Sequence, residues 1–309
     1  MFQIPYLKLV LALSPIFMLL VQPNAHAQTL EPRAYSNAPI GMNFLLIGYG
    51  YAEGGLFFDP STLITDANAK TDIGLFAFAQ TFAVAGQSAK YAVILPYARL
   101  DADGYLNGQY RQREVSGLAD PTFAVTVNLS GAPALATLDE FKHYQQDTII
   151  GATLKVTAPL GQYDDDKLLN IGTNRWSLKP EMGISQSLGN WIVEGAAAVT
   201  LYSTNNDFFG GQKLEQDPIY SAQGHLVYNF PRGLWVALDA TYYTGGQTAV
   251  DGVKTDNELK NWRFGATLAL PLNKKNSIKL DASTGISTRT GSDFDTVLLA
   301  WQHRWGAGL

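Results

Sequence analysis

Residues 278–288 read IKLDASTGIST, and this stretch decides the fold. Every second side chain is apolar or small, the set being Ile278, Leu280, Ala282, Thr284 and Ile286. The residues between them are charged, polar or glycine, namely Lys279, Asp281, Ser283, Gly285 and Ser287. Only a β-strand places successive side chains on opposite faces. The pattern therefore predicts a strand with one apolar face and one wet face.

The same alternation recurs along the chain and predicts twelve strands, near residues 40–52, 71–85, 89–101, 117–130, 146–160, 174–188, 190–204, 217–230, 233–245, 259–271, 275–288 and 293–305. Segments of this length suit a tilted crossing of the hydrocarbon layer, which takes about 9–11 residues. An even number of strands brings both chain ends to the same side. The sequence predicts an all-β fold, a closed antiparallel transmembrane β-barrel of outer-membrane type, formed as a single domain by residues 28–309.

The connections follow an order that supports the barrel. Short turns alternate with longer polar stretches, as expected when turns lie on the periplasmic side and loops outside. Two connections depart from it: 131–145 is long, and its LATLDEFKHY core predicts a short helix, whereas 289–292 is brief. Pro96 and Pro180 fall inside strands and predict either a bulge or a local break in the ladder.

Composition excludes several classes of protein. Apolar residues make up 46% of the chain and charged residues 16%, against about a quarter charged in soluble domains. No cysteine is present, which excludes disulfides, thiolate metal sites and a cysteine nucleophile. The net charge of −5, without a basic stripe, argues against nucleic acid as a partner.

The first residues predict export. Lys8 precedes a short apolar run at 9–21, and Ala25-His26-Ala27 provides the small residues that a signal peptidase needs. We expect residues 1–27 to be a cleaved signal peptide and the mature chain to begin at Gln28. Together with the strand pattern, this predicts the outer membrane of a Gram-negative bacterium.

Tryptophan positions near the strand ends predict aromatic girdles at the two membrane interfaces. The predicted girdle residues are Trp176, Trp191, Trp235, Trp262, Trp301 and Trp305. Tyr243 lies where its predicted strand meets a long loop, and it is grouped with the girdle residues.

The face opposite the apolar set predicts what lines the interior. The expected lumen residues are Lys155, Lys179, Glu181, Glu194, His225, Asp239, Arg263, Lys279, Asp281 and Arg304. They fit two roles, a network that packs the lumen and a lining that conducts a solute. Barrels of about eight strands are filled by side chains and those of sixteen or more enclose a channel, so twelve predicts a narrow passage.

Catalytic and metal sites receive weaker support. A lipid-modifying hydrolase is the enzyme alternative, but no motif places a nucleophile near His143, His225 or His303. The sequence therefore predicts no catalytic residues and no cofactor. Asp164-Asp165-Asp166 offers carboxylate oxygens for Ca²⁺ but lacks the full calcium-loop spacing, and because acidic loop clusters are usually just solvated, no metal site is predicted.

Several long strings resemble a known family. They are SGLADP (116–121), QDTIIGATLKVTAPLGQYDDDKLLNIGTNRWSLKPEMGIS (146–185), FFGGQKLEQDPIYSAQGHLVYNF (208–230), LWVALDATYYTGG (234–246) and STRTGSDFDTVLLAWQHRW (287–305). Together they resemble the bacterial family named for the meta-pathway of phenol degradation, whose members are described as transporters. The likeness covers nearly all of the mature chain. It implies an outer-membrane barrel, and it supplies no catalytic residues.

The resemblance also implies passive uptake of small aromatic or hydrophobic solutes. The expected partners are outer-membrane lipid, such a solute and, during biogenesis, the barrel-insertion machinery. The last aromatic residue differs in place from a common barrel ending, because Trp305 is followed by Gly306-Ala307-Gly308-Leu309 instead of closing the chain. This leaves open how the insertion machinery reads the terminus.

Overall fold

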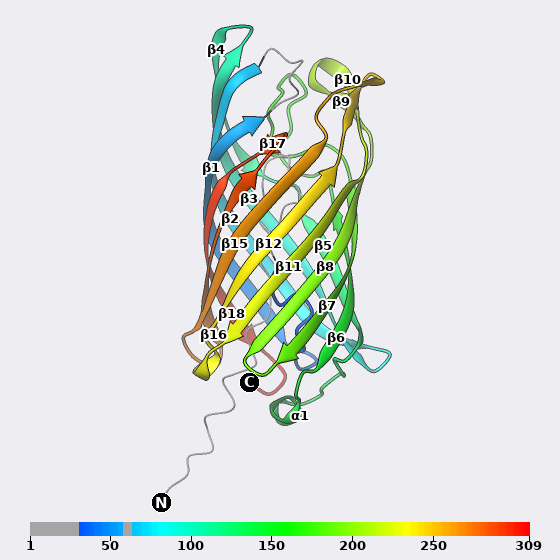
Figure 1. The fold of residues 1–309 in the computed structure, drawn as a ribbon, viewed down its shortest axis with the longest axis vertical. Coiled ribbons are helices and arrows are strands. Elements are labelled where there is room, and N and C mark those ends of the chain that lie inside the picture. Colours follow the sequence, from blue (N-terminus) through cyan, green and yellow to red (C-terminus); the bar gives the residue numbers. More distant parts are fainter. Residues whose placement is uncertain (1–30, 58–63) are drawn as a thin grey trace, which may run out of the picture.

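The computed structural model describes residues 31–57 and 64–309. An antiparallel sheet of twelve strands closes on itself, because β1 pairs with both β2 and β18. The wall strands are β1 (Asn43–Phe57), β2 (Ile64–Val84), β3 (Gln87–Leu106), β4 (Gln109–Leu118) continued by β5 (Thr122–Ser130), β6 (Thr148–Thr157), β7 (Ser177–Leu188), β8 (Trp191–Tyr202), β11 (Ile219–Asn229), β12 (Trp235–Gly245), β15 (Leu259–Pro271), β16 (Asn276–Ser287) and β18 (Asp295–Trp305). Figure 1 shows these strands as one upright barrel. The predicted fold is confirmed, while the predicted signal peptide, 1–27, lies outside the described residues.

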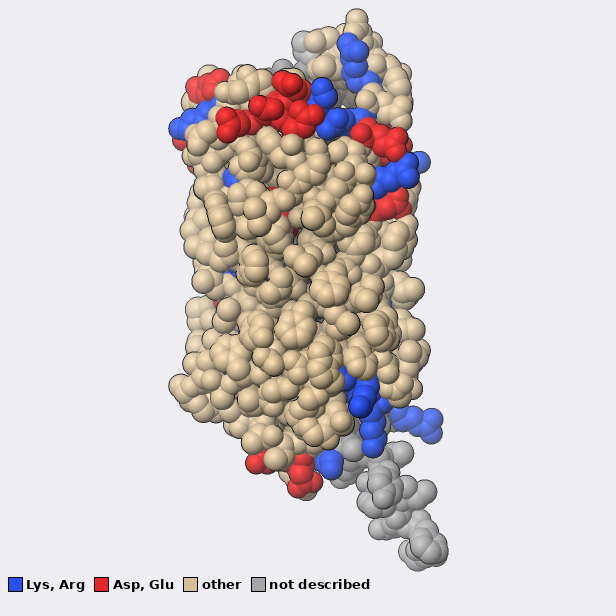
Figure 2. All heavy atoms as spheres, turned by 180° about the vertical axis from the view of Figure 1, so that it is seen from behind, with Lys and Arg blue, Asp and Glu red and all other residues tan. Residues whose placement is uncertain are grey.

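Alternation in the sequence becomes alternation in burial. Along β18, Leu298 and Arg304 are buried whereas Val297, Leu299 and Trp301 are exposed. The outward set of the other strands is equally apolar, and Figure 2 shows charged side chains gathered at the two ends with an uncharged belt between them. An exposed apolar belt of this extent is unfavourable in water and suits contact with lipid. The outer surface is therefore that of a membrane-spanning barrel.

The girdle prediction is wrong for Trp235. Its side chain is only 2% exposed and faces the interior, whereas Trp176, Trp191, Trp262, Trp301 and Trp305 are 38–53% exposed on the outside. Trp235 shares its parity along β12 with Asp239, so the two side chains must lie on the same side of the wall. Tyr243 has the same parity and is likewise buried.

The barrel extends further outward than predicted. Residues 53–57, 64–70 and 102–116, predicted as parts of loops, instead prolong β1 to β4, with a tight turn at Asn107-Gly108. Beyond the membrane the outer face of a strand is wetted, so polar residues appear on it and the apolar alternation fades. The stretches 205–216 and 246–258 contain a second small sheet of β9 (Asn205–Phe208), β10 (Gln212–Gln216), β13 (Thr248–Val250) and β14 (Val253–Lys254).

Both internal prolines sit at breaks in a ladder. β3 pairs with β5 up to Ile94 and with β4 from Tyr97, so Pro96 faces the gap between the two strand parts. Pro180 lies in a two-residue interruption of the β7–β8 ladder, between the pairs of Leu178 and Glu181. A residue without an N–H is tolerated where the ladder is interrupted.

The gap between β4 and β5 is held by one buried carboxylate, that of Asp120. Its Oδ1 accepts from the backbone N–H of Gly161 at 2.8 Å, and its Oδ2 accepts from the backbone N–H and hydroxyl of Thr173 at 2.8 and 2.7 Å. A Cβ on Gly161 would lie 2.8 Å from atoms of Asp120, so only glycine allows this approach. The SGLADP string thus fixes loop 158–176 to the wall.

Replacing Asp120 with alanine is expected to lower the free energy of unfolding by about 3 kcal/mol, because three donors lose a charged acceptor in a buried site. Urea unfolding in lipid vesicles, followed by tryptophan fluorescence, would measure it. Asp101→Ala is the matched control, since that carboxylate accepts from Gln112 at an exposed site. Equal midpoint shifts for the two variants would contradict the role given to Asp120.

The long periplasmic connection 131–145 contains the predicted helix, α1 (Leu138–His143), which begins with a capping box formed by Thr137 and Glu140. Phe141 is buried against Met42, Phe44 and Leu135, so α1 packs against the end of the barrel near the C-terminus (Figure 1). Among the described residues no helix has the length and hydrophobicity of a transmembrane helix.

Candidate functional site in the barrel lumen

A segment that precedes the first strand lies inside the barrel. Residues 31–42, called here the N-terminal segment, are almost entirely buried, with Arg33 at 5%, Tyr35 at 3% and Asn37 at 3% exposure. Toward its end, the N–H groups of Ile40 and Gly41 donate to Leu135 and Thr81. The earlier part is held to the wall strands mainly through side chains. It could therefore leave without breaking the hydrogen-bond ladder of the wall.

The ring of Tyr35 lies against two glycines that are direct cross-strand partners, Gly151 of β6 and Gly183 of β7. A Cβ at either position would come within 2.1–2.2 Å of that ring. The Tyr35 hydroxyl donates to Glu181 Oε1 at 2.9 Å. Two glycines side by side on the inner face of the wall thus form a flat seat for one aromatic side chain.

A cluster of buried charges surrounds this seat. Lys155 and Lys179 are cross-strand neighbours on β6 and β7, and Lys155 pairs with Glu31 of the N-terminal segment. Lys179 Nζ lies 3.5 Å from Glu181 Oε2, which also accepts from Gln223 at 3.2 Å. Charges removed from water are tolerated only when paired and hydrogen-bonded. The segment therefore supplies a carboxylate that the two wall lysines require.

Arg33 connects the segment to β8 and β11, the next two strands of the wall after β7. Its backbone N–H donates to Glu194 Oε2 at 2.5 Å, and its guanidinium donates to Asn229 Oδ1 at 3.1 Å. The guanidinium carbon and Lys279 Nζ each lie 5.4 Å from the Trp235 ring centroid. Trp235 thus forms a cation–π surface within the lumen, a role that its predicted girdle position did not suggest.

A second polar chain runs across β11, β12, β15 and β16. His225 Nδ1 lies 2.6 Å from Asp239 Oδ1, and the Thr267 hydroxyl lies 3.1 Å from Asp239 Oδ2 and 2.8 Å from Asp281 Oδ2. All four side chains are buried. This chain ties four strands together on the charged side of the lumen.

Arg263 and Arg304 lie near the two ends of the barrel and hold different segments. Arg263 donates to the Phe294 carbonyl oxygen at 2.6 Å and to Thr296 at 2.9 Å, and so holds Phe294 in the outer part of the lumen. Arg304 Nε donates to the carbonyl of Lys274 at 2.7 Å and fixes a periplasmic turn. All ten residues predicted for the lumen are thus buried inside the barrel, and eight of them belong to the two central networks.

Sequence reasoning missed the N-terminal segment, including Glu31, Arg33 and Tyr35. The segment has no strand periodicity, and the alternation argument begins only after it. The signal that could have revealed it is the pair of inward-facing glycines, Gly151 and Gly183, which leave room for a side chain from elsewhere.

The charges of the interior lie mainly on the side of β6 to β16, and on the other side Lys90 of β3 and Arg304 of β18 are buried near the periplasmic ends of their strands. From Phe44 to Leu56 the inward-facing residues of β1 are apolar or glycine: Phe44, Leu46, Gly48, Gly50, Ala52, Gly54 and Leu56. Ile73 and Leu75 of β2, Ile94 and Leu100 of β3 and Leu298 of β18 are buried beside them. We call this stripe along β1, β2, β3 and β18 the apolar track. It faces the charged networks of β6 to β16 across the lumen.

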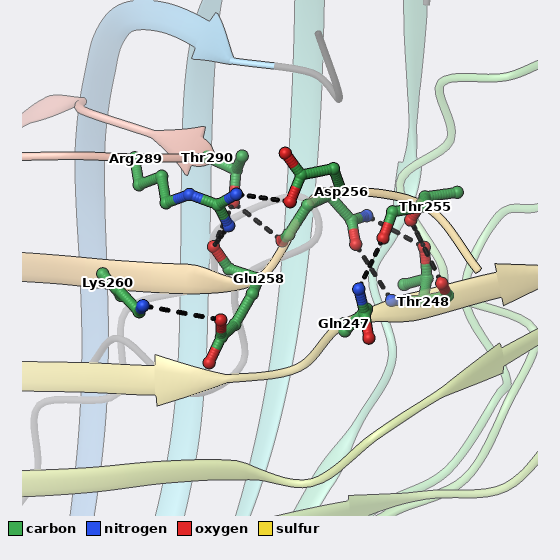
Figure 3. A network of polar contacts seen from close by, with 9 residues as sticks. Gln247, Thr248, Thr255, Asp256, Glu258, Lys260, Arg289 and Thr290 are labelled. Atoms are coloured by element: carbon green, nitrogen blue, oxygen red, sulfur yellow. Dashed lines mark hydrogen bonds and ion pairs between the residues drawn. The ribbon is translucent and has the colours of Figure 1, made fainter. Parts of the chain in front are cut away.

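At the outer end a polar network holds the loops, as Figure 3 shows. Arg289 pairs with Asp256 and donates to the carbonyl of Glu258 at 2.8 Å, while the Thr290 hydroxyl donates to the same carbonyl at 3.0 Å. Asp164, Asp165 and Asp166 bring their carboxylates within 4.8 Å of one another, but Asp164 also lies 3.9 Å from Arg113. The Asp165 and Asp166 side chains are exposed.

Each of the three histidines in the described chain contacts a carbonyl, carboxylate or amide oxygen. Such an oxygen is not a hydroxyl that could act as a nucleophile. His143 Nδ1 lies 2.8 Å from the Asp139 carbonyl, His225 contacts Asp239, and His303 Nδ1 lies 2.9 Å from Asn276 Oδ1. These contacts provide no nucleophile–base pair and so give the hydrolase alternative no support.

Two solved structures are similar in fold to this chain. An outer membrane channel from Pseudomonas putida F1 superposes with a TM-score of 0.78 at 21% identity, covering 90% of this chain and 100% of that one. The transport unit of the autotransporter AIDA-I from Escherichia coli gives 0.52 at 8% identity, covering 91% and 94%. No curated protein matches the sequence significantly.

The sequence itself matches one family model, described as "Putative MetA-pathway of phenol degradation", over residues 57–298. This match extends from the end of β1 into β18, and it includes four of the five strings that carried the resemblance in full and the fifth as far as Leu298. The chain therefore belongs to the phenol-degradation MetA-pathway family.

Proposed function

We propose that this barrel is an outer-membrane channel for the passive uptake of small aromatic or hydrophobic solutes. The observation that carries the proposal is the apolar track, a stripe of apolar side chains and glycines on the inner face of a barrel whose opposite face carries most of the buried charges. An apolar ring meets aliphatic side chains along the track, while a hydroxyl or carboxyl substituent meets the polar side. The outer membrane channel that shares this fold is consistent with passage through the lumen.

The N-terminal segment explains how such a barrel closes. It occupies the lumen between the track and the charged networks, with Ala38 packed against Ala79, Ala92 and Ala124 of the wall. Because its central part is held to the wall mainly by side chains, displacing it leaves the wall intact. We assign the described arrangement to a closed state, with displacement of the segment as the opening step.

Uptake by a deletion strain tests the proposal. At limiting concentrations, uptake of a labelled monocyclic aromatic acid or alcohol is expected to fall severalfold in the deletion strain and to return when the full chain is supplied. Glucose uptake is expected to stay unchanged, because the hydroxyl groups around the sugar ring would lose their hydrogen bonds to water against the aliphatic side chains of the track.

Two other outcomes would redirect the assignment. Equal loss of glucose uptake would indicate a general porin. Unchanged uptake of every compound would favour the alternative of a structural barrel with a packed lumen, for which the buried networks are the supporting observation.

A further inference from the structure

The outer end of the barrel contains a hollow of about 250 Å³ that none of the networks above explains. It lies on the inner side of the strand extensions that rise above the rest of the rim in Figure 1, opposite loop 166–169. Leu56 of β1, Ile64 of β2 and Leu106 of β3 line one side. Leu168, Leu169 and Phe209 line the other. We call this hollow the outer pocket.

The lining of the outer pocket is unusual for an end of the barrel that faces water. Leu106 is 43% exposed, Phe209 is 42% exposed and Leu168 is 38% exposed. Large apolar side chains gathered around a concavity are typical of small-molecule sites, in which a few polar groups fix the orientation. Arg111 and Arg113 supply such groups, because their direct cross-strand partners, Gly104 and Ala102, belong to the inward face of β3 and all four residues line the pocket.

The size of the pocket limits its occupant. A dry cavity of about 150 Å³ already accommodates benzene. A hollow of about 250 Å³ therefore suits a single ring with one or two substituents.

The floor of the pocket leads into the apolar track. Ala102 lines the pocket and also belongs to the buried apolar cluster of Ile73, Leu100 and Phe294, against which Leu56 and Leu169 pack. A molecule in the pocket would rest on Leu56 and Leu169, directly above this cluster. The side chains packed between the pocket and the interior of the barrel are thus apolar.

We propose that the outer pocket binds uncharged one-ring compounds and is the first binding site on their way into the lumen. The ring lies among Leu106, Leu168 and Phe209, and a hydroxyl substituent points to the guanidinium groups of Arg111 and Arg113. This inference rests on the proposed uptake function, to which it adds the site and the order of events.

The test uses 4-fluorophenol as the probe, because a phenol is uncharged at neutral pH and its fluorine is visible by ¹⁹F NMR. The full chain is placed in lipid nanodiscs, and empty nanodiscs provide the signal of probe that partitions into lipid. Leu168→Gln with Phe209→Gln is expected to weaken saturable binding at least tenfold. Val253→Gln, at another exposed apolar residue of the same rim, is expected to leave binding unchanged. Both sets of positions are exposed, so folding is preserved.

Binding that is absent from the unmodified chain, or equal in the double variant, would overturn the pocket. The uptake assay of the deletion strain separates the two proposals. Uptake without binding at the pocket would remove this site and leave the channel standing. Binding without any uptake would keep the site and remove the channel.

Discussion

Replacing Gly151 and Gly183 with valine is expected to raise the ionic conductance of the barrel in planar bilayers severalfold. A Cβ at each position would come within 2.1–2.2 Å of the Tyr35 ring, so the seat for this ring disappears. With Tyr35 displaced, Glu181 loses one of its hydrogen-bond donors and the N-terminal segment loses its central contact with the wall. Valine has a high strand propensity, so the wall itself should accept the change.

The matched control is Gly195→Val with Gly224→Val. These glycines are also cross-strand partners, on β8 and β11, and a Cβ on either meets nothing closer than 3.8 Å. They alternate with Glu194 and His225, so they face outward. Conductance is expected to match that of the unmodified chain. An unchanged conductance in the Gly151 and Gly183 variant would mean that Tyr35 does not hold the segment in the closed barrel.

Much of the fold could be predicted because one physical rule governs every wall strand. Lipid outside and a buried interior impose the same period of two from β1 to β18. The rule no longer applies where a strand extends beyond the lipid. Above the membrane β3 and β4 have water outside, and residues such as Asp101 and Asp103 make their strands resemble loops. The error at Trp235 was avoidable, because its parity with Asp239 already placed both residues inside.

Less of the candidate site could be predicted. The ten charged or polar lumen residues follow from parity, but their partners do not. Glu31 and Arg33 belong to a segment without periodicity, and their positions depend on contacts with strands more than a hundred residues away. The apolar track was missed for a different reason. On β1, Leu46 faces inward and Ile47 faces lipid, so both faces are apolar and alternation cannot assign them.

Removing the ammonium of Lys155 is expected to release the N-terminal segment. Lys155→Met leaves the buried Glu31 carboxylate without its paired cation, and breaking a buried ion pair from one side costs about 3–5 kcal/mol. The wall strands keep their hydrogen-bond ladders. Glu31 therefore regains contact with water at the lowest cost in free energy when the segment leaves the lumen. Lys179 remains near Lys155 and reduces the effect, and we therefore expect the lower end of this range.

Cysteine labelling measures this release, since the chain contains no cysteine of its own. A Ser36→Cys substitution places a single thiol at a site that is 7% exposed in the closed barrel. Reaction with a charged maleimide is expected to be about 10²-fold faster when Lys155→Met is added, because about 1.4 kcal/mol corresponds to each tenfold change in the open population. Adding Glu31→Gln to Lys155→Met is expected to restore most of the protection, since a neutral amide no longer demands a cation. Equal labelling rates in all three proteins would show that the ion pair does not keep the segment in place.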